Sequence, residues 1–399
     1  MNNKLSKLHP YPFEKLRILL NPVEKIKNIK LHQIDLSIGE PKHATPDCVK
    51  LAIKKNLEGI SVYPATKGSN KFRETVSQWI AKRYNIIAPD PNNDILPVLG
   101  SKEALFSLTQ TIIDSNNKNP LVICPNPCYQ IYEGAAILAG ADVYYTSINE
   151  NNKFAYNLDE IPSNILKNTQ LLFVCSPGNP TGNVIDLDTW KKIFNLSEKY
   201  GFVIASDECY SEIYLDEKKP TLGALQAASL LNKDHNKLIV LSSLSKRSNV
   251  PGLRSGFVVG DRKIINDFLL YRTYHGSAMS KLISEASIAA WSDEQHVIEN
   301  RILYRKKFSE VIPILNKAID INKPEASFYL WIKTPISDEI FAKELYKQYN
   351  VKVIPGSFLS RDFNGINPGK NYIRIALVDT IEDCVEAANR MVSFINSIS

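Results

Sequence analysis

The chain has 399 residues, of which 44% are hydrophobic and 23% charged, with a formal net charge of +6. These values are ordinary for a globular protein and exclude a disordered or fibrous chain. The positive charge is spread along the sequence without a sustained basic stripe, which excludes the usual pattern of a nucleic-acid-binding protein.

The first 20 residues, MNNKLSKLHPYPFEKLRILL, lack the continuous apolar stretch of a signal peptide. No segment reaches the length of about 18 uncharged apolar residues that a membrane-spanning helix needs. The six cysteines are scattered and lie mostly in apolar runs, as buried free thiols do. Cys124 and Cys128 of CPNPC lack the second ligand pair of a zinc site. We therefore expect a cytoplasmic protein without a bound metal.

Strand and helix patterns alternate through the middle of the chain. The runs that predict strands are at 95–100, 121–125, 171–177, 202–208, 237–243 and 256–260. Between several of them the apolar spacing predicts helices, including KEALFSLTQTII (102–113) and DLDTWKKIFNLSEKYG (186–201), the latter ending at Gly201. Strands buried on both faces with helices between them predict a mostly parallel sheet of the α/β class.

The length of the chain favours two domains. The predicted sheet places a large α/β domain at residues 46–275. A long helical stretch (280–319) and two strand patterns, SFYLWIK (327–333) and YIRIALV (372–378), then predict a smaller α+β domain at residues 276–399. We expect residues 1–45 to form an N-terminal segment that packs with the small domain.

Polar residues follow the predicted strands at the points where ligands bind in an open α/β sheet. In chain order these are Gly100, Ser101 and Lys102; Tyr129; Asn179; Asp207 and Tyr210; and Ser243, Ser245, Lys246 and Arg254. Each has an ordinary explanation alone, as a helix N-cap, a turn or a surface lysine. Together they meet the needs of pyridoxal 5′-phosphate: a lysine amine, an anion beside the pyridine nitrogen, and donors for the phenolate and phosphate oxygens.

The chain resembles the class I and II aminotransferases, which are pyridoxal phosphate enzymes of fold type I. The matching motifs follow the family's order over nearly the whole chain: SIGEP (37–41), YPATKGSNKFRE (63–74), GSKEAL (100–105), NPCYQIY (126–132), GNPTG (178–182), SDECYSE (206–212), SSLSKRSNVPGLRSG (242–256) and YIRIAL (372–377). The resemblance implies a large domain whose sheet is sandwiched by helices, a smaller α+β domain, and a homodimer with shared active sites.

The resemblance also implies a role for each residue near the cofactor. Lys246 matches the Schiff-base lysine that moves the substrate Cα proton, and Asp207 matches the acid that keeps the pyridine nitrogen protonated. Asn179 and Tyr210 match the hydrogen-bond partners of the phenolic oxygen, and Tyr129 matches the aromatic residue that stacks on the ring. The residues that match the phosphate site are Gly100, Ser101, the amide of Lys102, Ser243, Ser245 and Arg254.

Substrate contacts are implied in the same way. Arg374 matches the arginine that binds the substrate α-carboxylate, where a planar guanidinium can make two parallel hydrogen bonds. Asn179 lies in the same part of the matched site, and Gly39 matches a glycine whose backbone closes over the carboxylate. Tyr63 matches a tyrosine that reaches the cofactor phosphate of the neighbouring subunit.

Four stretches, LHPYPFEKLR, LSIGEPKHATP, YPATKGSNKFRE and SLSKRSNVPGLRSGF, are similar to the proteobacterial succinyldiaminopimelate aminotransferases of lysine biosynthesis. This similarity implies transfer of an amino group between N-succinyl-L,L-2,6-diaminopimelate and 2-oxoglutarate. The cofactor residues alone leave two alternatives open: another class I aminotransferase acting on aspartate, alanine or aromatic amino acids, or a C–S β-lyase.

Overall fold

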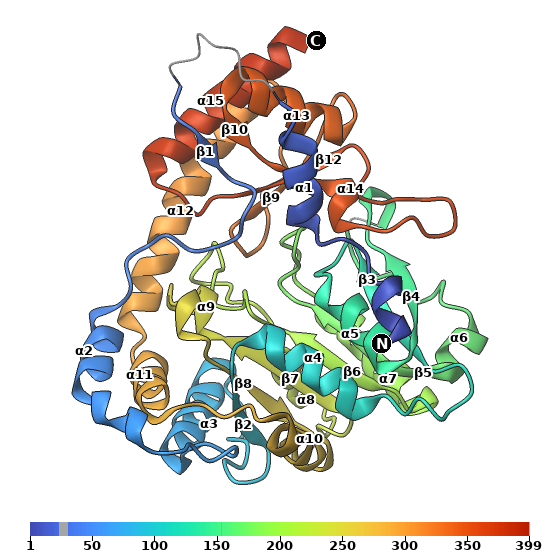
Figure 1. Cartoon of the computed structure of the whole chain (residues 1–399), viewed down its shortest axis with the longest axis vertical. Coiled ribbons are helices and arrows are strands. Elements are labelled where there is room, and N and C mark those ends of the chain that lie inside the picture. The colour runs from blue at the N-terminus through green and yellow to red at the C-terminus, as the bar shows by residue number, and fades with distance from the viewer. Residues whose placement is uncertain (24–30, 153, 399) are drawn as a thin grey trace.

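The computed structural model describes residues 1–23, 31–152 and 154–398. Its largest sheet has seven strands (Figure 1), which are, in spatial order, β2 (Ile95–Val98), β8 (Gly256–Gly260), β7 (Leu238–Ser243), β6 (Val203–Asp207), β5 (Thr169–Cys175), β3 (Leu121–Asn126) and β4 (Asp142–Ser147). β8 runs antiparallel to both of its neighbours, and the other pairs are parallel. The predicted mostly parallel α/β sheet is confirmed.

Helices cover both faces of this sheet because successive strand residues point to opposite faces. In β7, Val240 packs in the core that contains Trp190, whereas Ile239 and Leu241 pack in the core that contains Phe268. The helices of this unit are α2 (Asp47–Lys55), α3 (Asn70–Tyr84), α4 (Ser101–Ile112), α5 (Ile131–Ala139), α6 (Ser163–Asn168), α7 (Leu187–Tyr200), α8 (Ala224–Leu230), α9 (Leu244–Arg247), α10 (Arg262–His275) and α11 (Lys281–Ser292).

Capping chemistry sets the ends of the two helices predicted from apolar spacing. α7 begins after Asp186, whose carboxylate accepts the backbone N–H of Thr189 at 2.8 Å, and it ends at Gly201 with φ of 88°. α4 begins at Ser101, directly after Gly100 with φ of 82°. The free N–H groups of the first turn of α4 therefore lie just after β2. Free N–H groups at the start of a helix are a common binding site for anions.

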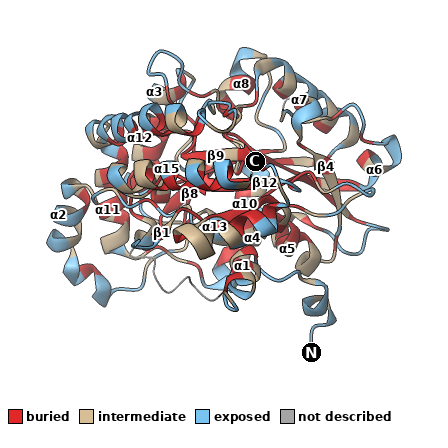
Figure 2. Ribbon diagram, turned by 90° about the horizontal axis from the view of Figure 1, so that it is seen from above, coloured by how far each residue is buried: buried red, intermediate tan, exposed pale blue. Residues whose placement is uncertain are grey.

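A second unit lies above the large sheet in Figure 1. Its three-stranded antiparallel sheet has the order β11 (Ile354–Pro355), β12 (Tyr372–Ala376) and β9 (Tyr329–Lys333), and it contains the helices α12 (Gln295–Leu315), α13 (Asp338–Tyr349), α14 (Gly356–Leu359) and α15 (Ile381–Ile398). The N-terminal helix α1 (Pro12–Leu20) contacts α13 and α14, and β1 (Ile34–Asp35) pairs with β10 (Val351–Lys352). Figure 2 shows buried residues concentrated in the strands and on the inner helix faces.

Helix α11 bears on the division into domains. It contacts α2 and α3, and its Trp291 packs in the same core as Trp79 of α3. After α11, the first residue in the core of the small unit is Phe308 of α12. The boundary at 275/276 stays a prediction, and limited proteolysis of the purified protein would locate it.

Within the described ranges, no helix is long and apolar enough to cross a membrane.

Candidate active site

A cavity of about 490 Å³ lies where the strands β5, β6 and β7 end and where β12 of the small unit approaches them. Its lining includes all the predicted site residues except Gly100 and Tyr63, namely Gly39, Ser101, Lys102, Tyr129, Asn179, Asp207, Tyr210, Ser243, Ser245, Lys246, Arg254 and Arg374. Gly100 lies immediately behind the lining, whereas Tyr63 is fully exposed to solvent. Residues that are far apart in the sequence therefore meet in one cavity.

Lys246 enters the cavity from the short helix α9, which directly follows β7. Its Nζ donates a hydrogen bond to the backbone carbonyl of Gly39 at 2.5 Å and lies 5.6 Å from the ring centroid of Phe328. Burial lowers the pKa of Lys246 to about 8, with a further contribution from the positive charge of Arg374. The uncharged amine that bond formation to a carbonyl carbon requires is therefore far more populated near neutral pH than in an ordinary lysine, although the ammonium form still predominates.

Asp207 ends β6 and is almost completely buried. Its Oδ2 accepts the hydroxyl of Tyr132 at 2.7 Å, and its Oδ1 accepts the backbone N–H of Cys209 at 3.2 Å. Burial raises the pKa of Asp207, while the hydrogen bonds from Cys209 and Tyr132 and the nearby Lys246 act in the opposite direction. Asp207 is thus a buried acid whose ionised form depends on neighbouring donors and cations.

Arg374 links the two units across the cavity. Its Nη1 donates to Oδ1 of Asn179 at 2.9 Å, and its Nη2 donates to the carbonyl of Ser37 at 2.7 Å. The guanidinium lies 4.3 Å from the ring centroid of Tyr329, whose hydroxyl is 3.0 Å from that of Tyr210. Arg374 Nε is buried and has no hydrogen-bond partner among the residues that the structure describes. The guanidinium is therefore held in place with a donor still available.

Another part of the lining consists of groups that suit a phosphate. A Cβ added to Gly100 would lie 2.5 Å from Nη2 of Arg254, so a side chain at this position would displace the guanidinium. Ser243 Oγ accepts the backbone N–H of Ser245 at 3.1 Å and contacts its hydroxyl at 3.0 Å. A cation, two hydroxyls and the first turn of α4 are the usual ligands of a phosphate group. Together with the Lys246 amine and the Asp207 carboxylate, these groups fit pyridoxal phosphate.

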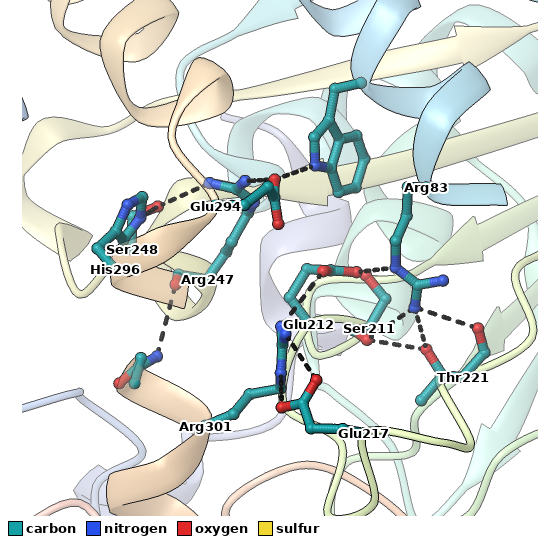
Figure 3. Close-up of polar contacts among 12 residues, drawn as sticks. Arg83, Ser211, Glu212, Glu217, Thr221, Arg247, Ser248, Glu294, His296 and Arg301 are labelled. Atoms are coloured by element: carbon teal, nitrogen blue, oxygen red, sulfur yellow. Dashed lines mark hydrogen bonds and ion pairs between the residues drawn. The ribbon is translucent and has the colours of Figure 1, made fainter. Parts of the chain in front are cut away.

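The residue after Lys246 is anchored in the core (Figure 3). Arg247 is buried between Trp79 and Trp291, with its guanidinium 5.4 and 4.7 Å from their ring centroids. It donates to the carbonyl of Ala290 at 2.7 Å and pairs with Glu294, which also accepts the indole N–H of Trp79 at 2.8 Å. The backbone of α9 is therefore fixed by contacts on the side away from the cavity.

A second set of buried charges supports the segment that follows Asp207. Glu212 pairs with Arg83 of α3 at 2.8 Å and with Arg301 of α12 at 3.8 Å (Figure 3). Arg301 also binds Glu217 at 2.7 Å, and Arg83 donates to the carbonyl of Thr221 at 3.3 Å. These ion pairs join α3, the 208–221 segment and α12 directly behind Tyr210.

Tyr132 and Tyr329 are among the lining side chains that sequence reasoning missed. Tyr132 lies three residues after Tyr129, so the two tyrosines project from neighbouring positions at the start of α5, and their ring centroids are 5.9 Å apart. Helical spacing from Tyr129 could have indicated Tyr132. Tyr329 lies in the SFYLWIK strand pattern, and no local signal distinguishes it from a core residue.

The fold and the cavity define a fold-type I enzyme of the α/β class, with a buried lysine at the end of a central strand. Residues 32–391 match the family described as Aminotransferase class I and II. The chain therefore belongs to the class I and II aminotransferase family, and it is a pyridoxal-phosphate-dependent aminotransferase.

Individual relatives match over almost the full length. The chain is 31% identical to an LL-diaminopimelate aminotransferase of Aquifex aeolicus (strain VF5) over 98% of each chain. Its structure is similar to the crystal structure of an aminotransferase from Neisseria meningitidis Z2491, with a TM-score of 0.95, 49% identity and coverage of 99% of this chain and 100% of that one. The aminotransferase AspB of Helicobacter pylori 26695 gives a TM-score of 0.88 at 31% identity, covering 98% of this chain and 99% of that one.

Proposed function

We propose that this enzyme transfers an amino group between N-succinyl-L,L-2,6-diaminopimelate and 2-oxoglutarate. The observation that carries the proposal is that the N-terminal segment contributes aromatic side chains to the cavity. Tyr11 and Phe13 line it, and both belong to the stretch LHPYPFEKLR that is similar to succinyldiaminopimelate aminotransferases. Lys102 Nζ lies 4.8 Å from the ring centroid of Tyr11 and adds a positive charge that suits a distal carboxylate.

In this proposal the Arg374 guanidinium, which is held in orientation by Asn179 and Ser37, binds the substrate α-carboxylate. The backbone of Gly39 closes beside the carboxylate. Lys246 holds the cofactor and accepts the proton from the substrate Cα as an uncharged amine. Bound pyridoxal phosphate supplies an electron sink for the carbon that loses this proton. Asp207, held by Tyr132, keeps a proton on the pyridine nitrogen, and Asn179 and Tyr210 donate to the phenolic oxygen.

The remaining contacts complete the cofactor site in the proposal. Tyr129 packs against the ring of the cofactor. The phosphate is bound by Gly100, Ser101, the amide of Lys102, Ser243, Ser245 and Arg254. These groups include the Arg254 cation and the first turn of α4. In this proposal Arg254 binds the phosphate and Arg374 binds the substrate carboxylate, so each anion has its own guanidinium.

We also propose a cytoplasmic homodimer with shared active sites. Tyr63 is fully exposed, and it follows an apolar surface strip made of Leu57, Ile60 and Val62, which are 54%, 73% and 66% exposed. Such a strip favours contact with another protein surface, and a second copy would take Tyr63 out of solvent. All six cysteines are free thiols, which fits a reducing compartment.

A second candidate donor is L,L-2,6-diaminopimelate itself. The Aquifex aeolicus relative that matches over 98% of each chain is named for this substrate. The unmodified compound shares the α-carboxylate and the chain length of the succinylated one, so the two differ only at the distal amino group. The two donors must therefore be compared directly on the same enzyme preparation.

The test is the conversion of enzyme-bound pyridoxal phosphate to the pyridoxamine form, followed by absorbance after adding one amino donor at a time. We expect N-succinyl-L,L-2,6-diaminopimelate to convert the cofactor fastest, and 2-oxoglutarate to restore it. Faster conversion by the unmodified diaminopimelate would replace the proposal with the second candidate. Fast conversion by aspartate, alanine or an aromatic amino acid alone would contradict both. Release of pyruvate from cystathionine without a keto-acid acceptor would indicate a C–S β-lyase.

A further inference from the structure

A chain of buried polar groups lies behind the backbone of Lys246. Nζ of Lys307 is 2.7 Å from Nε2 of His43, and Nδ1 of His43 is 2.6 Å from Oδ1 of Asn300. Lys307 and Asn300 are both on α12, with exposed fractions of 3% and 2%, and His43 is half-buried in the segment that follows β1. None of these three side chains lines the active-site cavity.

The direction of hydrogen bonding in this chain is determined by its members. A lysine amine in its ammonium form can only donate, so Nε2 of His43 must accept and the ring proton must lie on Nδ1. Nδ1 then donates to Oδ1 of Asn300, which also accepts from Nδ2 of Asn249 at 3.1 Å. The amide group of Asn300 is therefore fixed with its NH₂ on the opposite side.

The fixed NH₂ group faces the backbone of the cofactor-binding lysine. Nδ2 of Asn300 lies 3.4 Å from the carbonyl oxygen of Lys246 and 3.4 Å from that of Arg247. His43 is also four residues after Gly39, whose carbonyl accepts the Nζ of Lys246 at 2.5 Å. The segment that contains Gly39 and His43 thus contacts the amine of Lys246 directly and its backbone through Asn300.

We propose that His43, Asn300 and Lys307 are positioning residues that set the orientation of Lys246 in the active site. The proposal rests on the proposed role of Lys246 as the residue that holds the cofactor. The three residues do not touch the reacting atoms, and they act by holding the carbonyl groups at positions 246 and 247. A small displacement of this backbone moves Nζ relative to the substrate Cα, and transfer of a proton is sensitive to such a displacement.

The charges around the chain support the direction of donation. Burial, together with the positive charge of Lys307, lowers the pKa of His43 to about 4, so its ring is neutral at neutral pH. Burial lowers the pKa of Lys307 to about 8, and its amine is mainly protonated there. The other groups that face Lys307 are Cys384, Asp379 and Glu382, which favour its charged form, and Lys42, which opposes it. Lys307 therefore acts as the donor and His43 as the acceptor.

The first measurement compares steady-state kinetics of the holoenzyme and its variants. For His43→Ala and Asn300→Ala we expect kcat to fall by about 10- to 100-fold, with KM for the amino donor changed by less than about twofold because Arg374 is untouched. Lys306→Met serves as the matched control for Lys307→Met, because Lys306 is the exposed neighbour on the same helix. We expect a lower kcat for Lys307→Met and the wild-type value for Lys306→Met.

The second measurement uses cofactor-free protein and does not depend on turnover. The rate at which it captures pyridoxal phosphate, followed by the visible absorbance of the lysine-bound cofactor, should rise with pH with a midpoint near the pKa of Lys246, about 8. In His43→Ala we expect this midpoint to move upward, because a displaced Lys246 is better hydrated. The charged and titratable groups that face Lys246, which are Cys209, Glu40, Arg374, Arg254 and Asp207, are unchanged in this variant.

His43→Gln provides the conservative rescue. Its amide oxygen can accept from Lys307 and its NH₂ can donate to Asn300, so we expect it to recover most of the kcat and the midpoint lost in His43→Ala. A melting temperature measured for each variant identifies any that fails to fold. If His43→Ala or Asn300→Ala fails to fold, the same measurements on His43→Gln and Lys307→Met test the proposal. Folded variants with wild-type kcat and an unchanged midpoint would overturn the proposal. A wild-type protein that captures no cofactor would instead overturn the assignment of Lys246.

Discussion

Tyr132 shows how a single side chain controls the buried acid of the site. Its hydroxyl is one of the donors to the Asp207 carboxylate, and its ring stacks on Phe173 with centroids 4.5 Å apart. Both partners are far from Tyr132 in the sequence, so no motif marks the contact. The predicted residues at strand ends could be found because chain order and strand direction bring them together, whereas a hydrogen bond between a helix and a distant strand follows only from the packing.

We expect Tyr132→Phe to lower kcat by about 10- to 100-fold, because a hydrogen bond to a charged group contributes about 1.5–3 kcal/mol. The substitution removes the hydroxyl and keeps the ring in place, so the melting temperature should change little. Steady-state kinetics measure the effect, and Tyr271→Phe, which changes a tyrosine outside the cavity lining, is the control. A variant with wild-type kcat would show that the Asp207 carboxylate does not need this donor.

Glu208 is a buried acid next to Asp207 that the active site does not use. Its carboxylate accepts the hydroxyls of Ser206 and Tyr84 at 3.0 and 3.1 Å and the backbone N–H of Ala224 at 2.7 Å. Burial raises its pKa from 4.5 to about 7. Since its pKa is higher in the folded protein than in the unfolded one, ionisation of Glu208 lowers stability progressively between these two pH values.

Glu208→Gln should therefore stabilise the protein above pH 7, by roughly 1–3 kcal/mol, and give no such gain below the unfolded-state pKa. The amide oxygen can still accept from Ser206 and Ala224, and the NH₂ can donate to Tyr84. Denaturant unfolding at low and at high pH measures the difference. Glu58→Gln, which makes the same substitution at an exposed position, is the control. An equal change in stability at both pH values would contradict the expected titration.

At the scale of secondary structure, all six strands predicted in the large unit are present, as β2, β3, β5, β6, β7 and β8. β4 was missed because it is an edge strand with mostly half-buried residues, so its sequence, DVYYTS, lacks the apolar run of a central strand. The antiparallel direction of β8 was also missed, because an apolar run has the same pattern in either direction. The local sequence therefore predicts that a segment forms a strand, whereas the direction of the strand depends on how the chain connects it to its neighbours.

The contacts between elements include the ion pairs of Glu212, which join α3, the 208–221 segment and α12. We expect Glu212→Ala to lower the free energy of unfolding by about 3–5 kcal/mol, because it leaves the buried Arg83 guanidinium without its carboxylate. Thermal or denaturant unfolding measures the loss, and Glu310→Ala, at an exposed position of α12, is the control. Equal stabilities of the two variants would mean that the buried pair contributes nothing net.

At the scale of the whole molecule, Tyr63 tests whether the active site is complete in one subunit. It is fully exposed and absent from the cavity lining, although its motif matches a cofactor contact. We expect Tyr63→Ala to weaken pyridoxal phosphate binding by about tenfold, as the loss of one hydrogen bond to a charged phosphate would. Equilibrium titration of the cofactor-free protein measures the affinity.

Mixing this variant with Lys246→Ala gives a sharper test of shared sites. In a mixed dimer, one site combines an intact Lys246 with an intact Tyr63 from the other subunit, so cofactor binding of wild-type affinity should return at that site. Each variant alone lacks one of the two residues in both sites and serves as the control. Mixed dimers without any such recovery would place Tyr63 outside the cofactor site.

Helix α12 gives the molecule a mechanical property. It has 21 residues, which corresponds to a rod of about 32 Å at 1.5 Å per residue. Asn300, near one end, touches the backbone of Lys246, and Phe308 and Val311, further along, belong to the core of the small unit that carries Arg374. Any tilt of the small unit relative to the large sheet would therefore also move the near end of α12 at the backbone of Lys246. If binding of a carboxylate at Arg374 tilts the small unit, the position of the Lys246 amine would change although no ligand touches α12.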